Sequence, residues 1–534
     1  MTKQNISPWK KLLDVLKLEK KDILQVLYYA LFTGLISLTL PLGIQAIINM
    51  LQGAQVSTSW ILLTVLVTIG VGFVGALQVL QLDIVENIQE KIFARASFEF
   101  VHKIPKIRVR ELEKRYPPEL ANRFFDVLTL QKGLQKLLLD FPAAVIQIFF
   151  GLILLSLYHA FFIAFGIALV ILMYIIFKFT LTKAVNSSIL ESKKKYHIAF
   201  WIQQVAANFK IFKIYPDEYE QNKNNELVES YLKERQSHFG IVKNQFKQMV
   251  LFKVIVTLGL LLIGGLLVLN QQMNIGQFVA AEIIIVMVIN SVEKIGFSLE
   301  TIYDVVTAVE KISEVSDQKL DRKSNGNGHT AQLFPLRIED LKIWNYKAKD
   351  IIVTRNMAIN VVTNQVVTNS LFQYMSGMKR TKKGKIFFNH EEISNINLDE
   401  YRNKIALVLN SDQVFEGTVW ENISLSNPKM DQNTVYELAQ KFNILEEIQA
   451  LPNTLSTYIF PGYKKLSDNS IRKICLLRAL LKKPHILMIE EGFITTKNDK
   501  EALLNYVNDN NICLFLGSQS PLTGPFETLS LTKS

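Results

Sequence analysis

Cysteine is scarce in this chain: only Cys475 and Cys513 occur among 534 residues. Two cysteines cannot form a disulfide framework, which excludes a small disulfide-stabilised secreted fold. No group of His, Cys, Asp and Glu has the spacing of metal ligands, so the sequence predicts no metal cluster. A short apolar signal segment is also lacking, because residues 9–21 are amphipathic and basic. We expect residues 1–22 to form an elbow helix on the inner face of a membrane.

Charged residues make up only 20% of the chain, whereas hydrophobic residues make up 49%. This balance is typical of a membrane protein. The net charge of +11 does not indicate nucleic acid as a partner, because no nucleic-acid-binding motif accompanies it. Lys and Arg gather instead in segments that flank or join apolar runs, as in membrane proteins with positive cytoplasmic loops.

Six apolar segments are long enough to cross a bilayer, which takes about 20 residues. They are 23–51, 60–82, 141–158, 161–177, 250–269 and 276–292. The short connections between them contain no Lys or Arg, but the long ones, 86–140 and 178–249, are rich in both. This asymmetry predicts a multi-pass protein of the cytoplasmic (inner) membrane with both long loops and both termini in the cytoplasm.

The long loops have apolar residues at helical spacing, so we expect helices that continue from the membrane into the cytoplasm. The run 193–195 is three lysines, which we interpret as a solvated helix face. Within the spans, Pro41 predicts a kink in the first helix. Glu282 is an ionisable residue at membrane depth, so it is a candidate transport residue, with a hydrogen bond inside the helix bundle as the alternative.

The cluster Ser-Asn-Gly-Asn-Gly at 324–328 predicts a flexible joint. Beyond residue 335, short apolar runs alternate with helical stretches, which is typical of an α/β domain. We therefore predict four parts: the elbow helix 1–22, a six-helix membrane domain 23–315, a linker 316–334 and an α/β domain 335–534.

The most specific pattern lies in residues 465–491. It begins Lys-Leu-Ser-Asp-Asn-Ser, continues as a helical stretch ending Leu-Arg-Ala-Leu-Leu, and closes with the apolar run Ile-Leu-Met-Ile before Glu490 and Glu491. This pattern resembles the ATPase domain of ABC transporters, in which Leu-Ser-Gly-Gly-Gln opens a helix and a later strand ends in Asp-Glu. Here Asp468-Asn469-Ser470 replace Gly-Gly-Gln, and Glu490 replaces the magnesium-linked Asp.

The six spans with long cytoplasmic loops also resemble the membrane domain of ABC exporters, and a Leu-Pro-Leu in the first span is similar to the type I secretion and toxin exporters. The resemblance places a first coupling segment at 118–126 and the helix after the second at 199–215. The block 414–423 matches a family segment that lies near the coupling helices. The implied fold is a six-span exporter domain followed by a P-loop-like α/β nucleotide-binding domain.

The resemblance also assigns the positions of a nucleotide site. A phosphate-binding loop needs Gly-x-x-x-x-Gly-Lys-Ser/Thr, but residues 362–371 contain no glycine. The assigned positions are Tyr346 for adenine stacking, Thr368 at the lysine, Asn369 and Ser370 after it, Asn410 at the Q-loop Gln, Ser467 of the signature, Glu490, Glu491 at the catalytic Glu, Lys497 in the D-loop and Ser518 at the switch His. Ser370 has a hydroxyl that could reach magnesium.

The resulting hypothesis is a half-transporter subunit in which binding and hydrolysis of ATP with Mg²⁺ are weak or lost. It forms a homodimer in the lipid bilayer, or a heterodimer with an intact half-transporter, and exports peptides, lipids or amphipathic compounds. The alternative is a non-hydrolysing scaffold or regulator that assembles with other membrane proteins or with a periplasmic adaptor protein.

Overall fold

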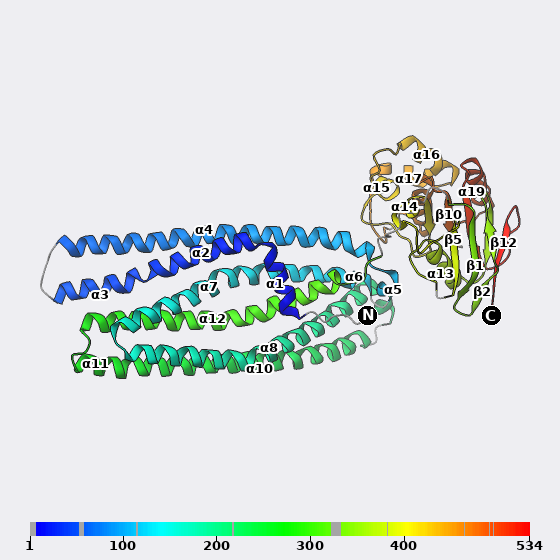
Figure 1. Cartoon of the computed structure of the whole chain (residues 1–534). Coiled ribbons are helices and arrows are strands. Elements are labelled where there is room, and N and C mark those ends of the chain that lie inside the picture. The colour runs from blue at the N-terminus through cyan, green and yellow to red at the C-terminus, as the bar shows by residue number, and fades with distance from the viewer. Residues whose placement is uncertain are drawn as a thin grey trace. The chain divides into compact units, whose positions relative to one another are not determined.

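The structure, a computed structural model, describes residues 7–52, 58–113, 116–215, 218–321, 333–381, 383–463, 465–490, 492–494 and 496–533. It contains two compact units, which Figure 1 shows as a set of long helices and a body of strands and helices. The helical unit comprises Met1–Lys106 and Arg115–Gln318, and the α/β unit comprises Ile107–Lys114 and Lys319–Ser534.

Long helices make up the helical unit. They are α1 (Pro8–Leu18), α2 (Lys20–Ser37), α3 (Thr39–Gln52), α4 (Thr58–Lys103), α7 (Asp126–Tyr158), α8 (Phe161–Ala207), α10 (Tyr219–Gly259) and α12 (Ile275–Ser316). The shorter elements are η1 (Ile104–Lys106), α6 (Pro117–Ala121), η2 (Asn122–Phe125), α9 (Phe209–Ile214), η3 (Leu260–Gly264) and α11 (Gly265–Leu269).

Five stretches of helix in the described residues are long and apolar enough to cross a membrane. They are Lys20–Gln52, Thr58–Lys106, Pro117–Tyr158, Tyr219–Leu269 and Ile275–Ser316. The remaining predicted span, 161–177, corresponds to the shorter apolar helix Phe161–Ile175. The sequence therefore predicted the order of apolar helices correctly, because hydrophobic runs of this length have few alternatives.

Local sequence explains where several helices begin and end. α1 begins with Pro8, whose fixed backbone angle suits the first helical turn. The first span is interrupted at Leu38, where α2 ends and α3 follows. Pro41 lacks an N–H group and crowds the carbonyl four residues earlier, which accounts for this break. α12 begins with a capping box in which Asn274 and Gln277 bond reciprocally.

The core of the helical unit lies along α7 and α12, which run side by side in Figure 1. Apolar residues of α12, such as Ile284, Val288 and Tyr303, are buried. In contrast, α4 has strongly exposed apolar side chains, including Leu62 at 70% and Ile69 at 65%. An outward apolar surface of this kind suits contact with lipid.

Glu282 lies on an exposed face of α12, and the part of the chain that the structure describes gives it no hydrogen bond or ion pair. The alternative, a hydrogen bond from the Glu282 side chain to another helix of the same chain, is thus not seen. Its role in transport stays a prediction.

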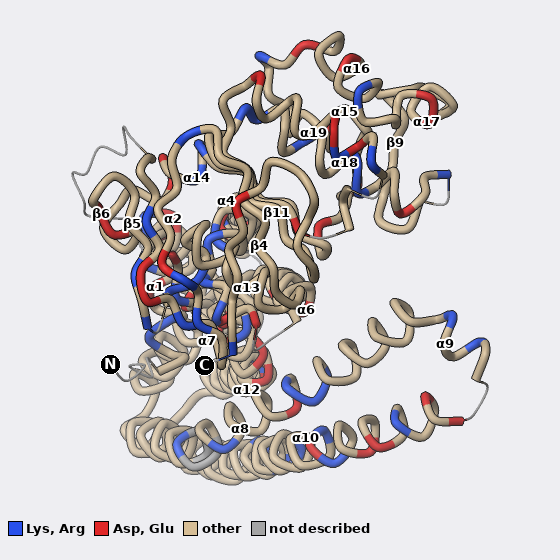
Figure 2. The backbone as a smooth tube through the Cα atoms, turned by 90° about the vertical axis from the view of Figure 1, so that its right-hand side faces the viewer, with Lys and Arg blue, Asp and Glu red and all other residues tan. Residues whose placement is uncertain are grey.

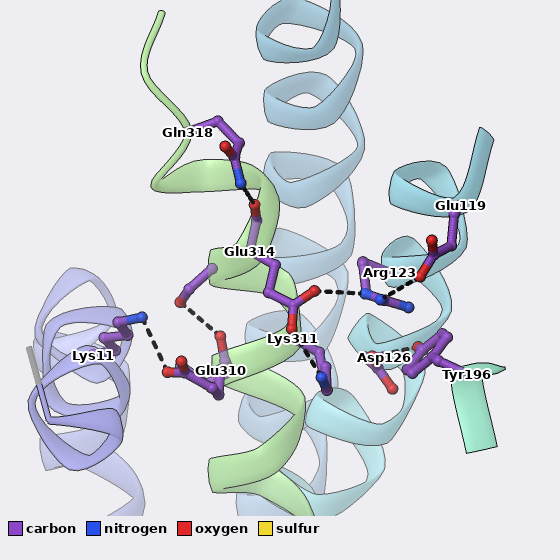
Figure 3. A network of polar contacts seen from close by, with 11 residues as sticks. Lys11, Glu119, Arg123, Asp126, Tyr196, Glu310, Lys311, Glu314 and Gln318 are labelled. Carbon is purple, nitrogen blue, oxygen red and sulfur yellow. Dashed lines mark hydrogen bonds and ion pairs between the residues drawn. The ribbon is translucent and has the colours of Figure 1, made fainter. Parts of the chain in front are cut away.

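A buried polar network joins the end of α12 to α6, η2 and α8 (Figure 3). The guanidinium of Arg123, whose side chain is only 6% exposed, donates to Glu314 at 3.0 Å and to Glu119 at 2.9 Å. Lys311 pairs with Glu314 at 2.8 Å, and Arg123 lies 3.7 Å from the centre of the Tyr196 ring. Because removing one partner of a buried ion pair costs about 3–5 kcal/mol, these contacts fix the ends of the helices.

Charged residues of both signs follow α8 and α10 toward the turn at α9 (Figure 2). Among them, Lys193 and Lys195 are exposed, as expected for a solvated helix face. The predicted helix 199–215 is two helices, because α8 ends at Ala207 and α9 follows it.

The α/β unit is built on one large sheet. Its strands are β1 (Leu336–Ile343), β2 (Tyr346–Ala348), β3 (Ile351–Val353), β4 (Ala358–Val362), β5 (Lys383–Phe388), β6 (Glu391–Glu392), β7 (Ile405–Val408), β10 (Ile486–Ile489), β11 (Cys513–Ser518) and β12 (Glu527–Lys533). The order is β6-β5-β1-β2-β12-β4-β11-β10-β7, with β3 beside β1. The strands from β12 to β7 are parallel, and those from β6 to β2 are antiparallel.

Helices surround this sheet, and a short hairpin lies apart from it. The helices are α13 (Gln365–Met375), α14 (Leu398–Asn403), α15 (Val419–Ser424), α16 (Gln432–Lys441), α17 (Leu445–Gln449), η4 (Thr454–Ser456), α18 (Asp468–Leu481) and α19 (Lys497–Asp509). The hairpin pairs β8 (Gly417–Thr418) with β9 (Tyr458–Ile459). Every residue of β10 and β11 is buried, which explains why these strands are continuous apolar runs.

The segment Ile107–Lys114, which contains α5 (Val109–Leu112), packs within the α/β unit. Arg108 N–H donates to the carbonyl of Lys319 at 3.0 Å, and Glu113 forms an ion pair with Lys379. The sequence placed the first coupling segment at 118–126, but those residues form α6 and η2 inside the helical unit. Buried Leu120 and Arg123 hold 118–126 among these helices, and which segment couples the two units stays a prediction.

Candidate functional site at the ends of the parallel strands

The carboxyl ends of β4, β11, β10 and β7 meet at one edge of the sheet, where α/β proteins commonly bind ligands. This edge brings together the start of α13, Asn410, Glu490 and Ser518. The backbone N–H of Asn410 donates to Glu490 Oε2 at 2.7 Å. The N–H of Thr363 donates to the carbonyl of Ser518 at 3.1 Å. The sequence therefore grouped these positions correctly.

The loop between β4 and α13 is very short. Only Thr363 and Asn364 separate the end of the strand from the first helical residue, Gln365. Asn364 is the N-cap: its side-chain oxygen accepts from Val367 N–H at 3.0 Å, and its carbonyl accepts from Thr368 N–H at 3.0 Å. These N–H groups are thus already bonded within the protein.

Tyr346 closes the same loop from the side of β2. Its hydroxyl accepts a hydrogen bond of 3.0 Å from the side-chain amide of Asn364. The predicted adenine-stacking residue is therefore half-buried and hydrogen-bonded to the cap of α13.

Two hydroxyl groups of α13 are buried and donate hydrogen bonds to backbone carbonyls of the preceding turn. Thr368, at the lysine position, is 2% exposed, and its Oγ1 donates to the Asn364 carbonyl at 3.3 Å. Ser370 is 5% exposed, and its Oγ donates to the Val366 carbonyl at 2.9 Å. The surface next to them is apolar, because the Val366 side chain is 56% exposed.

Glu490 follows β10 and is 1% exposed. Burial raises the pKa of its carboxyl, while hydrogen bonds from Asn410 N–H and the Asn369 side chain hold the pKa down in part. Asn369 is itself fixed, because its Oδ1 accepts from Gln373 at 2.5 Å. Glu491, predicted as the catalytic carboxylate, lies outside the residues that the structure describes.

Ser518 belongs to a buried polar cluster that the sequence analysis missed. Asn360 is fully buried in β4 and donates to Ser518 Oγ at 2.6 Å and to the Leu516 carbonyl at 3.2 Å. Its Oδ1 accepts from Leu522 N–H at 2.9 Å. The signal was an amide side chain inside an apolar strand, since a buried amide needs partners.

Ser467 begins α18 rather than joining the cluster at the sheet edge. As the N-cap, it accepts from Ser470 N–H at 3.0 Å. Ser470 is fully buried, and its hydroxyl contacts Glu447. Asp468 occupies the exposed first turn, where a carboxylate complements the positive end of the helix. Lys497, at the start of α19, is exposed and lies 3.9 Å from Glu501.

In the block 414–423, side-chain hydrogen bonds to backbone groups hold the segment in place. The side chain of Asn422 accepts from Phe415 N–H at 2.9 Å and donates to the carbonyls of Phe415 and Thr418 at 2.9 and 3.1 Å. Arg478 of α18 donates to the Asn422 carbonyl at 2.6 Å. A groove of about 430 Å³ lies beside this block and is lined by Arg478, Lys482 and residues of α15.

Family comparisons cover both units. A profile of the ABC transporter transmembrane region matches residues 23–292, half of the chain. A second profile, described as ABC transporter, matches residues 369–493. The second match begins at Asn369, so the loop positions 362–368 lie outside it.

Individual proteins agree with these profiles. The chain is 23% identical over 261 residues to the colicin V secretion/processing ATP-binding protein CvaB of Escherichia coli, which covers 47% of this chain and 37% of that protein. It is 33% identical over 129 residues to the ABC-type transporter fsqE of Aspergillus fumigatus, covering 24% of this chain and 10% of the relative. A solved bacterial Atm1-family ABC exporter with ATP bound is 12% identical and has the same fold, with a TM-score of 0.81 over 94% of this chain and 91% of that one.

Proposed function

This chain belongs to the ABC transporter family, and we propose that it is an exporter-type half-transporter subunit whose α/β unit binds ATP with magnesium weakly or not at all. The observation that carries this proposal is the two-residue loop before α13. Phosphate-binding loops present free backbone N–H groups on a glycine-rich turn. In this chain the same positions form a helical turn capped by Asn364.

The residues at this edge do not fit a nucleoside triphosphate. Thr368 supplies no positive charge, and it is buried against its own helix. Asp468 places a negative charge at the start of α18, where the family's signature would face a phosphate. Both differences oppose the binding of an anion, because phosphoryl transfer depends on positioned positive charge.

The residues also lack a suitable set of magnesium ligands. Ser370, the predicted hydroxyl ligand, bonds to its own helix. Glu490 Oε2 accepts from the N–H of Asn410, its Oε1 is buried without a hydrogen-bond partner among the described residues, and burial disfavours its charged form. Magnesium prefers several open oxygen ligands and water molecules. No hydrolytic step is therefore assigned to this chain.

Transport remains the function that the architecture favours. We place the subunit in the cytoplasmic membrane with both termini in the cytoplasm, as a dimer with itself or with an intact half-transporter. Its export cargo would be peptides, lipids or amphipathic compounds. The intact block 414–423 and its neighbouring groove support a surface that still transmits movement between units, which a passive scaffold would not need.

The test is nucleotide binding by the purified full-length chain in detergent. Labelled ATP is titrated to millimolar concentration, once with magnesium and once with EDTA, and the Glu490→Gln variant is measured beside the wild type. We expect no magnesium-dependent binding in either protein. Saturable binding that needs magnesium and changes in Glu490→Gln would overturn the proposal.

A second measurement separates transporter from scaffold. Co-reconstitution with a candidate intact half-transporter should give ATP-dependent export that is lost when the groove residue Arg478 is changed to Ala. If the two chains assemble but the intact half-transporter exports equally well when it is reconstituted alone, the scaffold role is the better description.

A further inference from the structure

The α/β unit contains a second cavity, which is distinct from the edge described above. Its volume is about 960 Å³, within the usual range for small-molecule sites. It lies at the carboxyl end of α13 and is lined by residues of that helix end, of the β1–β2 turn, of the start of β5 and of the segment 107–114. Ten helical steps from Asn364 to Tyr374 separate it from the cap of α13 by about 15 Å.

Positive charge dominates the lining. Its basic residues are Arg108, Arg110, Lys342, Lys379, Arg380 and Lys383, against the acidic residues Glu113 and Asp321. Both carboxylates are already paired, Glu113 with Lys379 and Asp321 with Arg402 at 2.9 Å. Among the described residues, none forms an ion pair with the other five cations of the lining.

Two of these lysines lie opposite each other on neighbouring strands. Lys342 of β1 and Lys383 of β5 are direct partners in an antiparallel pair. Like charges in this position repel and destabilise the strands. The nearby carboxylate of Asp340 attracts both lysines but forms its ion pair with Lys347 at 2.7 Å, so it offsets the repulsion only in part. An anion bound between the two lysines would remove this repulsion.

An aromatic surface lies beside the charges. Trp344 occupies the first position of the two-residue turn between β1 and β2, with a left-handed backbone (φ +57°) and 72% exposure. Glycine is the residue that such a position favours, and a bulky residue there costs backbone strain. Tyr374 lies in the same lining and is half-buried. Flat rings next to unpaired cations suit a ligand with a planar base and phosphates.

A lipid headgroup is a poor candidate for the anion. The segment 107–114 follows η1 and the continuous helix α4. From the predicted end of its apolar span at residue 82 to residue 106, the chain rises about 36 Å if it stays helical. This length of helix separates the segment 107–114 from the predicted span along the chain, which favours a soluble ligand over a lipid headgroup.

We propose that this cavity binds a nucleoside polyphosphate without magnesium, with the phosphates on Lys342 and Lys383 and the base against Trp344. Binding here is regulatory rather than catalytic, because the lining offers cations and rings but no group placed to activate water. The proposal is independent of the proposed function, since it concerns other residues and needs no metal.

The experiment measures binding of two probes, ATP and inorganic tripolyphosphate, to the full-length chain in EDTA. Both should bind saturably, and added salt should weaken both. The double variant Lys342→Gln/Lys383→Gln should weaken both probes on the order of 100-fold, because two charge-assisted contacts are lost. Lys385→Gln is the matched control: it removes a lysine of the same strand outside the lining, and it should change neither affinity.

The Trp344→Leu variant tests the base. It should weaken ATP about tenfold and leave tripolyphosphate unchanged, as expected for the loss of one stacking contact. Equal effects on the two probes, or no saturable binding of either, contradict the proposal. Binding that survives the double lysine change but falls in Glu490→Gln would place the nucleotide at the sheet edge, which contradicts the proposed function instead.

The ligand-free protein gives a second readout. Relief of the lysine repulsion should raise the thermal midpoint of the double variant above that of the wild type without ligand, while saturating ATP should raise the wild type more. A double variant that is less stable than wild type without ligand contradicts the repulsion on which the site depends.

Discussion

The block 414–423 and the edge at the start of α13 differ in their buried polar groups, because at the edge Thr363 Oγ1 and Glu490 Oε1 are buried without a hydrogen-bond partner among the described residues. In the block, Asn422 and Arg478 bond to backbone groups and fix a surface segment beside a groove. At the edge, the side chains of Asn364, Thr368 and Ser370 are already hydrogen-bonded within the protein, mostly to the backbone of α13 itself. The comparison teaches that a fold can keep its framework while side chains at a former ligand site become hydrogen-bonded within the protein.

The largest expected effect lies in the block. Asn422→Ala removes three hydrogen bonds of a fully buried amide and leaves their backbone partners unsatisfied. We expect a loss of about 3 kcal/mol in stability of the α/β unit, measured as a lowered thermal midpoint. Asn427→Ala, at an exposed position of the same region, is the control and should change little. Equal midpoints for the two variants would show that the block is not held by Asn422.

A smaller effect is expected when the missing lysine is restored at the edge. Thr368→Lys puts a charge where the wild-type side chain is 2% exposed, so we expect a loss of about 2 kcal/mol and no gain of magnesium-dependent ATP binding. Val366→Lys, two residues earlier and 56% exposed, should leave the stability nearly unchanged. Recovery of nucleotide binding by Thr368→Lys would mean that the loop opens readily.

The cap of α13 gives the next effect in size. Asn364→Ala loses the bonds to Val367 N–H and to the Tyr346 hydroxyl, which should cost about 1 kcal/mol. Asn364→Ser keeps a capping oxygen and should recover most of this loss. The two thermal midpoints, compared with wild type, measure the contribution of the cap; if they coincide, the cap does not hold the first turn in place.

The smallest effect concerns Glu490 and depends on pH. Burial raises its pKa in the folded protein, so the native state is penalised above that pKa, and the penalty fades as the pH falls toward the ordinary pKa of a glutamate. Glu490→Gln should therefore be more stable than wild type at neutral pH, by at most about 1 kcal/mol. Thermal midpoints at a series of pH values should converge toward acid; a difference that grows toward acid has the wrong sign.

Much of this fold was predictable because hydrophobic patterns are strong constraints. The apolar runs gave the order of the membrane helices, and the run before Glu490 gave a buried strand. The family resemblance assigned Asn410, Glu490 and Ser518 to one site, and all three lie at one edge of the sheet, while their roles stay predictions. The helices and the strand were predicted from periodicity and spacing, which depend little on distant contacts, whereas the site positions came from the family resemblance.

Other features depended on tertiary contacts. The first turn of α13 occupies the expected loop, although Asn364 before a helical stretch was a readable cap signal. The place of 118–126 inside the helical unit depends on buried Arg123, which pairs with Glu314 far along the chain. The cavity lysines Lys342 and Lys383 meet through strand register, which the sequence does not specify by itself.

The central claim is that the first turn of α13 stays closed in the presence of nucleotide. The most direct measurement is a cryo-electron microscopy structure of the full-length chain with ATP and magnesium at millimolar concentration. We predict that residues 365–368 remain helical, with Asn364 bonded to Val367 N–H and no nucleotide at this edge. An unwound turn wrapped around a phosphate would contradict the claim and make this chain an ATP-binding subunit.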